Sequence, residues 1–202
     1  MNSFEPTNFK NDSISYLTPS WDELNLLTFQ VSNQIKQQDQ KFNRIVTLAK
    51  GGWPMTRSLS DFLDIDQIAS IGIKFYCGLN QRLNKPEIYQ ELPVEVRGEQ
   101  LLLFDDVADT GESLVFTIGH LMDKGAKEVK TASLFYKPHS KIKPNFFGAQ
   151  TDSWIIFPFE HCEMVKTLHE KWLKNNLSIV EITKRFEKLG FSKDIINSAL
   201  NN

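Results

Sequence analysis

Apolar residues along the chain alternate between short continuous runs and runs with helical spacing. The continuous runs and one looser alternation predict strands at residues 44–49, 68–76, 100–106, 129–136 and 153–157. Apolar residues three or four positions apart predict amphipathic helices at about 21–38 and 113–124, and Pro54 after a glycine turn predicts the start of a helix at about 54–62. Strands that alternate with helices predict an α/β fold, a parallel sheet with helices on both faces.

The remaining segments lack this alternation. Residues 1–18 are polar and aperiodic, which predicts a partly ordered N-terminal arm. Residues 77–98 contain several Gly, Pro and Asn and predict a long loop, part of which could be strand-like, for example Glu91 to Val96. Such a loop inside a compact domain is usually functional. The last part of the chain is helical and rich in lysine. We therefore expect an arm at 1–18, one domain at 19–160 and a helical C-terminal extension at 161–202.

Composition narrows the class of protein. Lys and Arg number 23 against 25 Asp and Glu among 202 residues, and this net charge of -2 gives no reason to expect a nucleic-acid or membrane partner. Cys77 and Cys162 match no metal motif and form no disulfide framework. No apolar run approaches membrane length, so we expect a cytoplasmic protein.

The most informative segment is the strand Leu101–Phe104, which delivers two adjacent acids, Asp105 and Asp106, and leads through a short turn into a helix. In open α/β sheets, ligands bind beyond the carboxyl ends of the strands. The turn offers backbone N–H groups at a helix N-terminus, which suits a phosphate. The two acids would repel a phosphate but can accept hydrogen bonds from a ribose diol. Helix capping is the structural alternative for these aspartates.

Asp105 to Ser113 resembles the phosphoribosyl pyrophosphate (PRPP) signature of the type I phosphoribosyltransferases, and the resemblance covers about residues 20–160. It implies that family's Rossmann-like parallel sheet, a small base-binding hood, PRPP as substrate and Mg²⁺ as cofactor. It also implies a homo-oligomer, commonly a dimer. The implied PRPP-binding residues are Asp105, Asp106, Val107, Ala108, Asp109, Thr110, Gly111, Glu112 and Ser113, and Asp105 and Asp106 would hold the metal mostly through water.

The resemblance implies a pyrophosphate loop after the first core strand, where Ala49, Lys50, Gly51 and Gly52 stand. A plain strand-to-helix turn is the alternative. Lys74 ends the next strand, as a pyrophosphate-contacting lysine does in purine members, although it could equally be an ordinary surface lysine. The loop 77–98 is then similar to a mobile catalytic hood that closes over PRPP and excludes water.

Base recognition is implied later in the chain. Lys137, in Phe135-Tyr136-Lys137-Pro138, is similar to the lysine that donates to O6 of the base in purine enzymes, which favours oxopurines over adenine. Trp154 resembles the aromatic residue that stacks on the purine, although core packing is the usual role of a lone tryptophan. Backbone carbonyls from Ile155 onward would contact the C2 position.

The implied reaction joins a ring nitrogen of hypoxanthine, guanine or xanthine to C1 of PRPP and releases pyrophosphate. Asp109 would lie near N7 of the purine as base or orienting group, with turn capping as the alternative. The chief alternative hypothesis is that the protein is a regulator that binds PRPP or nucleotides on the same fold. A transferase for orotate, adenine or another base is disfavoured by Lys137 and Trp154. The sequence does not rank the three oxopurines.

Overall fold

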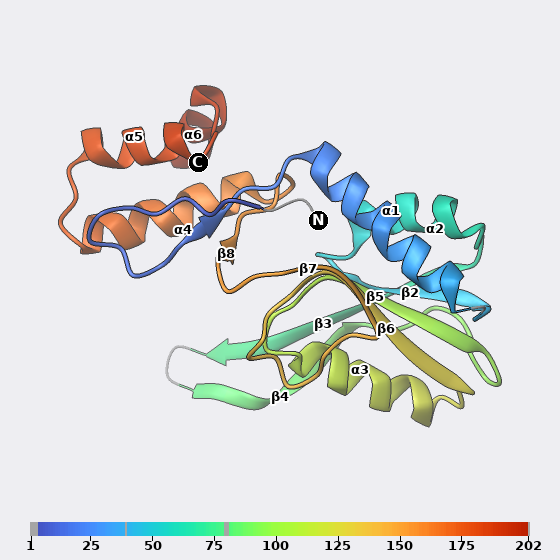
Figure 1. Ribbon diagram of the computed structural model, residues 1–202. Helices are drawn as coiled ribbons and strands as arrows, with labels where there is room; N and C mark the ends of the chain where they lie inside the picture. The colour runs from blue at the N-terminus through green and yellow to red at the C-terminus, as the bar shows by residue number, and fades with distance from the viewer. Residues whose placement is uncertain (1–3, 39, 79–80, 202) are drawn as a thin grey trace. The chain divides into compact units, whose positions relative to one another are not determined.

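The computed structural model describes residues 4–38, 40–78 and 81–201. The chain forms two compact units, which we describe separately. The sheet unit comprises residues 24–151. The terminal unit joins residues 1–23 to residues 152–202, so it draws on both ends of the chain (Figure 1). These units differ from the expected boundaries at 18 and 160.

A six-stranded sheet forms the centre of the sheet unit, in the order β4-β3-β2-β5-β6-β7. All neighbouring pairs are parallel except β3 with β4, and the predicted α/β class is therefore confirmed. The strands are β2 (Arg44–Ala49), β3 (Ile68–Gly78), β4 (Gln81–Gln90), β5 (Gln100–Ala108), β6 (Glu128–Tyr136) and β7 (Phe146–Gln150).

Helices cover both faces of this sheet, with α1 (Trp21–Gln37) and α2 (Trp53–Leu63) on one side and α3 (Glu112–Asp123) on the other (Figure 1). The central strand β5 is apolar on both faces because both are covered. Its Leu101 and Leu103 belong to one apolar cluster with Leu114 and Leu121 of α3. The alternating residues Leu102 and Phe104 are equally inaccessible to solvent.

The predicted loop at 77–98 is wrong for most of its length. Residues 79–80 of that loop lie outside the described residues, but β4 occupies 81–90 and pairs antiparallel with β3. Pairing within a hairpin satisfies backbone groups that a loop would leave to water. Pro86, which argued against a strand, is tolerated because β4 is the edge of the sheet and its outer side needs no donor.

The terminal unit contains β1 (Tyr16–Leu17), β8 (Trp154–Ile155), α4 (His161–Lys174), α5 (Ile179–Lys188) and α6 (Lys193–Leu200). The expected arm is ordered here, because β1 pairs in parallel with β8 and Tyr16 is buried in the same cluster as Trp172. The strand expected at 153–157 is thus only two residues long and belongs to a separate small sheet. The strand that completes the main sheet is β7, which the apolar pattern did not single out.

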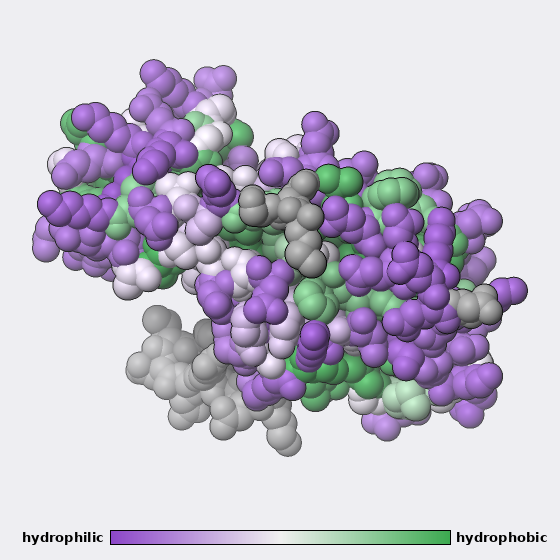
Figure 2. Space-filling model, in the orientation of Figure 1, coloured by the Kyte–Doolittle hydropathy of each residue, from purple (hydrophilic) through white to green (hydrophobic). Residues whose placement is uncertain are grey.

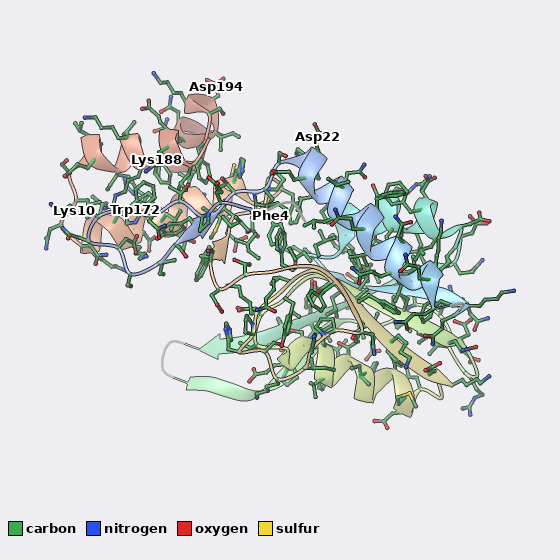
Figure 3. All side chains as sticks on the ribbon, in the orientation of Figure 1. Phe4, Lys10, Asp22, Trp172, Lys188 and Asp194 are labelled. Atoms are coloured by element: carbon green, nitrogen blue, oxygen red, sulfur yellow. The ribbon has the colours of Figure 1, made fainter. Side chains whose placement is uncertain are left out.

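A buried carboxylate ties the N-terminal segment to the C-terminal helices. Asp12, whose side chain is 2% exposed, accepts hydrogen bonds from Lys171 at 2.9 Å, Trp172 Nε1 at 3.0 Å and Tyr16 Oη at 2.7 Å. Arg185 lies 3.6 Å from its second oxygen. Figure 3 shows Trp172 on α4, beside the N-terminal segment that carries Lys10. Burial alone would raise the pKa of Asp12, but these donors outweigh it and lower the pKa.

Polar side chains cover most of the face shown in Figure 2, with smaller apolar areas between them. Within the described part of the chain, every helix is too short or too polar to span a bilayer.

Candidate active site

The carboxyl end of β5 carries the two adjacent acids that the sequence singled out. The backbone N–H of Asp106 donates to Asp105 Oδ1 at 3.0 Å, and that of Val107 donates to Asp106 Oδ1 at 2.7 Å. Burial and the neighbouring charge of Asp106 raise the pKa of Asp105, and burial raises the pKa of Asp106 to about 6. This end of β5 therefore concentrates negative charge that a cation or a hydrogen-bond donor would stabilise.

The turn after β5 leads directly into α3. Gly111 is the N-cap residue with φ of 75°, a conformation that favours glycine. A Cβ at Gly111 would also lie 3.1 Å from the backbone nitrogen of Ile142, so no larger residue fits without a shift. The helix that follows is 12 residues long and has no side-chain cap, and the first N–H groups of a helix have no partner within the helix itself. This is the geometry of an anion site.

The loop after β2 lies against the same carboxylates. A Cβ at Gly51 would overlap the side chain of Asp106, with its Cγ only 2.6 Å away, and a Cβ at Gly52 would lie 2.9 Å from the carbonyl oxygen of Phe104. The peptide bond between Ala49 and Lys50 is cis. Because β2 and β5 are neighbours in the sheet, the two glycine-containing loops meet at one edge. The structure thus brings the predicted pyrophosphate loop and the predicted diol acids together.

Lys74 lies on β3 and faces the hairpin partner strand. Its ammonium is 3.5 Å from Glu87 Oε2, and both side chains are about half exposed. Tyr89 on β4 was not anticipated; its hydroxyl lies 3.5 Å from the carbonyl oxygen of Ala49, so it borders the same loop. Sequence reasoning missed Tyr89, because this residue lies in the segment that was predicted to be a loop.

The predicted base-binding residues are divided between the two units. Lys137 follows β6 in the sheet unit, is 8% exposed, and donates its backbone N–H to the carbonyl of Ala108 at 3.0 Å. Trp154 and Ile155 form β8 in the terminal unit. Trp154 is 44% exposed and donates its indole N–H to the sulfur of Met164 at 3.3 Å, whereas Ile155 is buried. The hydrogen bond to Met164 therefore holds one edge of the Trp154 ring, while a large part of the ring surface stays accessible to solvent.

The described residues contain no group of three or more His, Cys, Asp or Glu side chains arranged to hold a metal. Asp105 and Asp106 offer oxygen donors only, the type that Mg²⁺ prefers. Mg²⁺ is usually held by one or two carboxylates, with water and substrate oxygens completing its shell. The pair fits such a shared site and does not fit a site closed by protein ligands alone.

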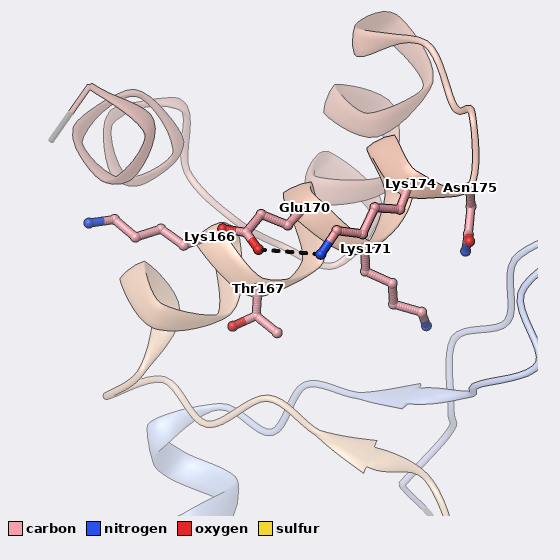
Figure 4. Close-up of a pocket in the computed structure, with 6 residues that line it drawn as sticks. All are labelled: Lys166, Thr167, Glu170, Lys171, Lys174 and Asn175. Atoms are coloured by element: carbon pink, nitrogen blue, oxygen red, sulfur yellow. Dashed lines mark ion pairs between the residues drawn. The ribbon is translucent and has the colours of Figure 1, made fainter. Parts of the chain in front are cut away.

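The terminal unit contains a shallow pocket of about 480 Å³, which is lined by residues of α4 and its C-cap. Figure 4 shows its lining, with the ion pair between Glu170 and Lys174 across it at 3.9 Å. None of the predicted site residues lines it.

The family match spans the whole sheet unit and adjoining parts of the terminal unit. The model of the phosphoribosyl transferase domain family matches residues 19–163. The chain belongs to this family. Xanthine-guanine phosphoribosyltransferase of Gluconobacter oxydans is 23% identical over 150 residues, which cover 73% of this chain and 86% of the relative.

Solved structures agree with this family assignment. The purine phosphoribosyltransferase of Pyrococcus horikoshii Ot3 matches with a TM-score of 0.64 and 29% identity, over 71% of this chain and 93% of that one. A Neisseria gonorrhoeae protein matches with a TM-score of 0.66 and 22% identity, over 74% and 92% of the two chains. The expected class of enzyme, a purine phosphoribosyltransferase, is confirmed at the level of the family.

A second residue of this phosphoribosyltransferase, His139, was also missed by sequence reasoning although it lies beside a predicted site residue. His139 Nε2 is 3.2 Å from Asp109 Oδ1, and both side chains are 58% exposed. Proximity in the sequence gives no clue, since 30 positions separate the two residues. The signal that could have found it is the Lys137-Pro138 pair, because proline favours a β-turn that folds His139 back over the neighbouring strand end.

Proposed function

We propose that this chain transfers the phosphoribosyl group of PRPP to a 6-oxopurine and releases pyrophosphate. The observation that carries the proposal is the convergence of three features at neighbouring strand ends. A carboxylate pair, Asp105 and Asp106, precedes a helix N-terminus at Gly111, and the buried Lys137 follows the adjacent strand. A diol, a phosphate and a carbonyl acceptor are the groups that these features suit, and an oxopurine with PRPP supplies all three.

For PRPP, the two acids would accept hydrogen bonds from the ribose hydroxyls, and the turn from Asp109 to Ser113 would hold the 5-phosphate. The diphosphate would lie at Gly51 and Gly52, where the lack of side chains keeps the backbone accessible beside Asp106. Lys74 would exchange Glu87 for the diphosphate. That exchange costs little, because exposed ion pairs contribute about 0–1 kcal/mol.

Mg²⁺ fits the oxygen donors of Asp105 and Asp106 as a shared site with PRPP. When bound, it would neutralise charge on the departing diphosphate. The chain's own part is to hold the two carboxylates in place, through the N–H groups of Asp106 and Val107. The raised pKa values of the pair support this assignment, because burial raises them by disfavouring the charged carboxylates, and a bound cation would offset that cost.

For the base, Lys137 would donate to O6, and Trp154 would stack on the ring through its accessible surface. Carbonyls from Ile155 onward would contact C2. An exocyclic amine at position 6 is itself a donor and cannot accept a hydrogen bond from Lys137, which disfavours adenine. The names of the curated relatives, xanthine-guanine and hypoxanthine-guanine phosphoribosyltransferases, support oxopurines as the substrate class.

The bond from C1 to the diphosphate oxygen breaks, and its electron pair leaves with pyrophosphate. The bond from N9 to C1 forms from the ring nitrogen's lone pair. The proton on N7 of the reacting base passes to the Asp109 carboxylate, which returns it to solvent after product release. Asp109 is suitably exposed for this role at the end of β5.

The test is turnover of the full chain with PRPP, Mg²⁺ and, separately, hypoxanthine, guanine, xanthine and adenine. We expect a nucleoside monophosphate and pyrophosphate in equal amounts from at least one oxopurine, and at least about tenfold lower kcat/KM with adenine. Equal use of adenine would contradict the O6 assignment. We also expect a homodimer, which light scattering would measure.

A second candidate is a regulatory protein that binds PRPP or nucleotides without catalysis. One observation favours it: the similar Neisseria gonorrhoeae protein carries bound ppGpp. Tight binding of a guanine nucleotide, together with absence of turnover with all four bases, would decide for this candidate.

A further inference from the structure

The loop after β6 folds onto the turn after β5. Its two ends are fixed by backbone hydrogen bonds, from Lys137 N to Ala108 O at 3.0 Å and from Lys141 N to Thr110 O at 2.9 Å. The side chain of Lys141 adds an ion pair to Glu112 at 2.7 Å. The loop from 137 to 141 therefore runs beside the turn from 108 to 112, and the two segments are held in register.

His139 occupies the middle of this loop. Ser140 N donates to Lys137 O at 2.9 Å, which closes a β-turn with Pro138 in its second position and His139 in its third. Proline is favoured in the second position because its fixed φ matches that of the turn. Ser140 Oγ is bound in turn to the carbonyl of Ile142 at 3.0 Å. The backbone on both sides of His139 is thus constrained, so its ring is presented to the β5 turn.

The ring meets Asp109, with Nε2 at 3.2 Å from Oδ1. An ionised carboxylate only accepts hydrogen bonds, so this contact requires the proton of the neutral ring to be on Nε2. The other charged groups of the two loops are Lys137 and the Lys141–Glu112 pair. Both partners of the His139–Asp109 contact are 58% exposed, and such a pair adds little to folding. Its place at the ligand-binding edge of the sheet calls for another explanation.

We propose that His139 is a positioning residue for Asp109. Its Nε2–H holds one carboxylate oxygen, which fixes the rotamer of Asp109 and directs the second oxygen to the ring N–H of the base. The inference rests on the proposed function, since it assigns His139 a role in the proton transfer to Asp109. A carboxylate held in one orientation raises the turnover rate more than it raises substrate affinity, because orientation matters most while the proton moves.

Three substitutions separate this role from simple packing. Glutamine can place its amide nitrogen near the position of Nε2, whereas the shorter asparagine matches Nδ1 instead, and alanine removes the donor. We expect His139→Ala and His139→Asn to lower kcat about tenfold with little change in the KM for PRPP, and His139→Gln to keep most of the rate. Arg57→Ala is the control. It breaks a comparably exposed ion pair with Asp61 on α2 and should leave kcat unchanged.

A double-mutant cycle completes the test. In an Asp109→Asn background, His139→Ala should lower kcat no further, because the group that it positions is gone. An equal loss in both backgrounds, or equal loss in the Gln and Ala variants, would overturn the inference. Nitrogen NMR of the histidine ring gives a readout that needs no activity, with the Nε2–H form expected in the wild type and its population reduced in Asp109→Asn.

These outcomes distinguish failure of the positioning role from failure of the proposed function. If the wild type turns over no purine base, the proposed function fails, and the NMR comparison still decides whether His139 is held by Asp109. If the wild type is active and His139→Ala is as fast, the positioning role fails while the proposed function stands.

Discussion

Carboxylates lie in opposite surroundings in the two units of this phosphoribosyltransferase. In the terminal unit, Asp12 is enclosed by Lys171, Arg185 and hydrogen-bond donors, and these groups lower its pKa. In the sheet unit, Asp105 and Asp106 adjoin each other with no ion pair to a described cation, and burial raises their pKa values.

This difference in surroundings indicates different roles for Asp12 and for the pair Asp105 and Asp106. A carboxylate that already has its cations contributes to folding and has little left to offer a ligand. A pair whose charge is not neutralised by the protein destabilises the free fold and gains from a ligand that brings donors or a cation. Function would therefore concentrate at the end of β5, and stability at Asp12.

The largest expected effect follows from removing the unneutralised pair. Asp105→Asn combined with Asp106→Asn should weaken PRPP binding about 100-fold or more, because each lost charge-assisted hydrogen bond is worth about 1.5–3 kcal/mol. Isothermal titration measures the affinity, and circular dichroism should show an intact fold. Asp61→Asn, an exposed acid on α2, is the control. Unchanged affinity in the double variant would contradict a ligand-binding role for this pair.

Removing the paired carboxylate should damage folding instead. Asp12→Asn leaves two cations without their partner, and breaking such a buried pair costs about 3–5 kcal/mol. Hydrogen exchange should show faster opening of residues 161–200 and little change in β2, β5 and β6. The control is Glu170→Gln, which breaks an exposed ion pair with Lys174 on α4 and should have almost no effect on hydrogen exchange.

The lowered pKa of Asp12 predicts that the stability of the terminal unit depends on pH. A lowered pKa means that the stabilisation by Asp12 is fully present above the ordinary aspartate pKa of about 3.9 and is lost as the pH falls below it. The terminal unit of the wild type should therefore lose stability below about pH 4, and Asp12→Asn should lose less over the same range. Parallel acid-unfolding curves for the two proteins would contradict this account.

Base choice gives a moderate effect. Lys137→Met should remove most of a roughly tenfold preference for oxopurines by slowing the oxopurine reaction, because the O6 donor is lost. Trp154→Ala should lower kcat/KM for all purines by a similar factor, since stacking does not distinguish the group at position 6. Values of kcat/KM for hypoxanthine, guanine and adenine check both. If Trp154→Ala changes the ratio between bases, its role is not unselective stacking.

The smallest expected effect is a change in the hydrogen exchange of β4 and the segment that follows it. If residues 81–98 close over bound PRPP, their amides should exchange more slowly with PRPP and a non-reactive base analogue than without them. The comparison needs β5 as an internal reference, because its amides should be protected in both states. Equal exchange of 81–98 in the two states would speak against a catalytic hood.

The strand-end chemistry was readable from the sequence because it is local. Asp105 to Ser113 forms one continuous segment, so a strand, an acid pair, a turn and a helix start could be recognised without knowing any distant contact. The loop at 49–52 was also identified, although only the structure shows that Gly51 is required by the carboxylate of Asp106.

The errors fell where long-range pairing decides. The polar segment before residue 18 gave no periodic signal, and its order comes from β8, which lies more than 100 positions later in the chain. The hairpin strand β4 carries a proline and many polar residues, and only its place at the sheet edge makes it a strand.

The sequence by itself determined the fold class, the family and the turn that carries the proposed PRPP site, because apolar periodicity and a contiguous motif are local properties. Tertiary structure alone decided that Asp12 meets Lys171 across 159 positions and that His139 meets Asp109 across 30. Such contacts depend on which strands become neighbours and on how loops are tied at their ends. One-dimensional spacing does not encode those relations.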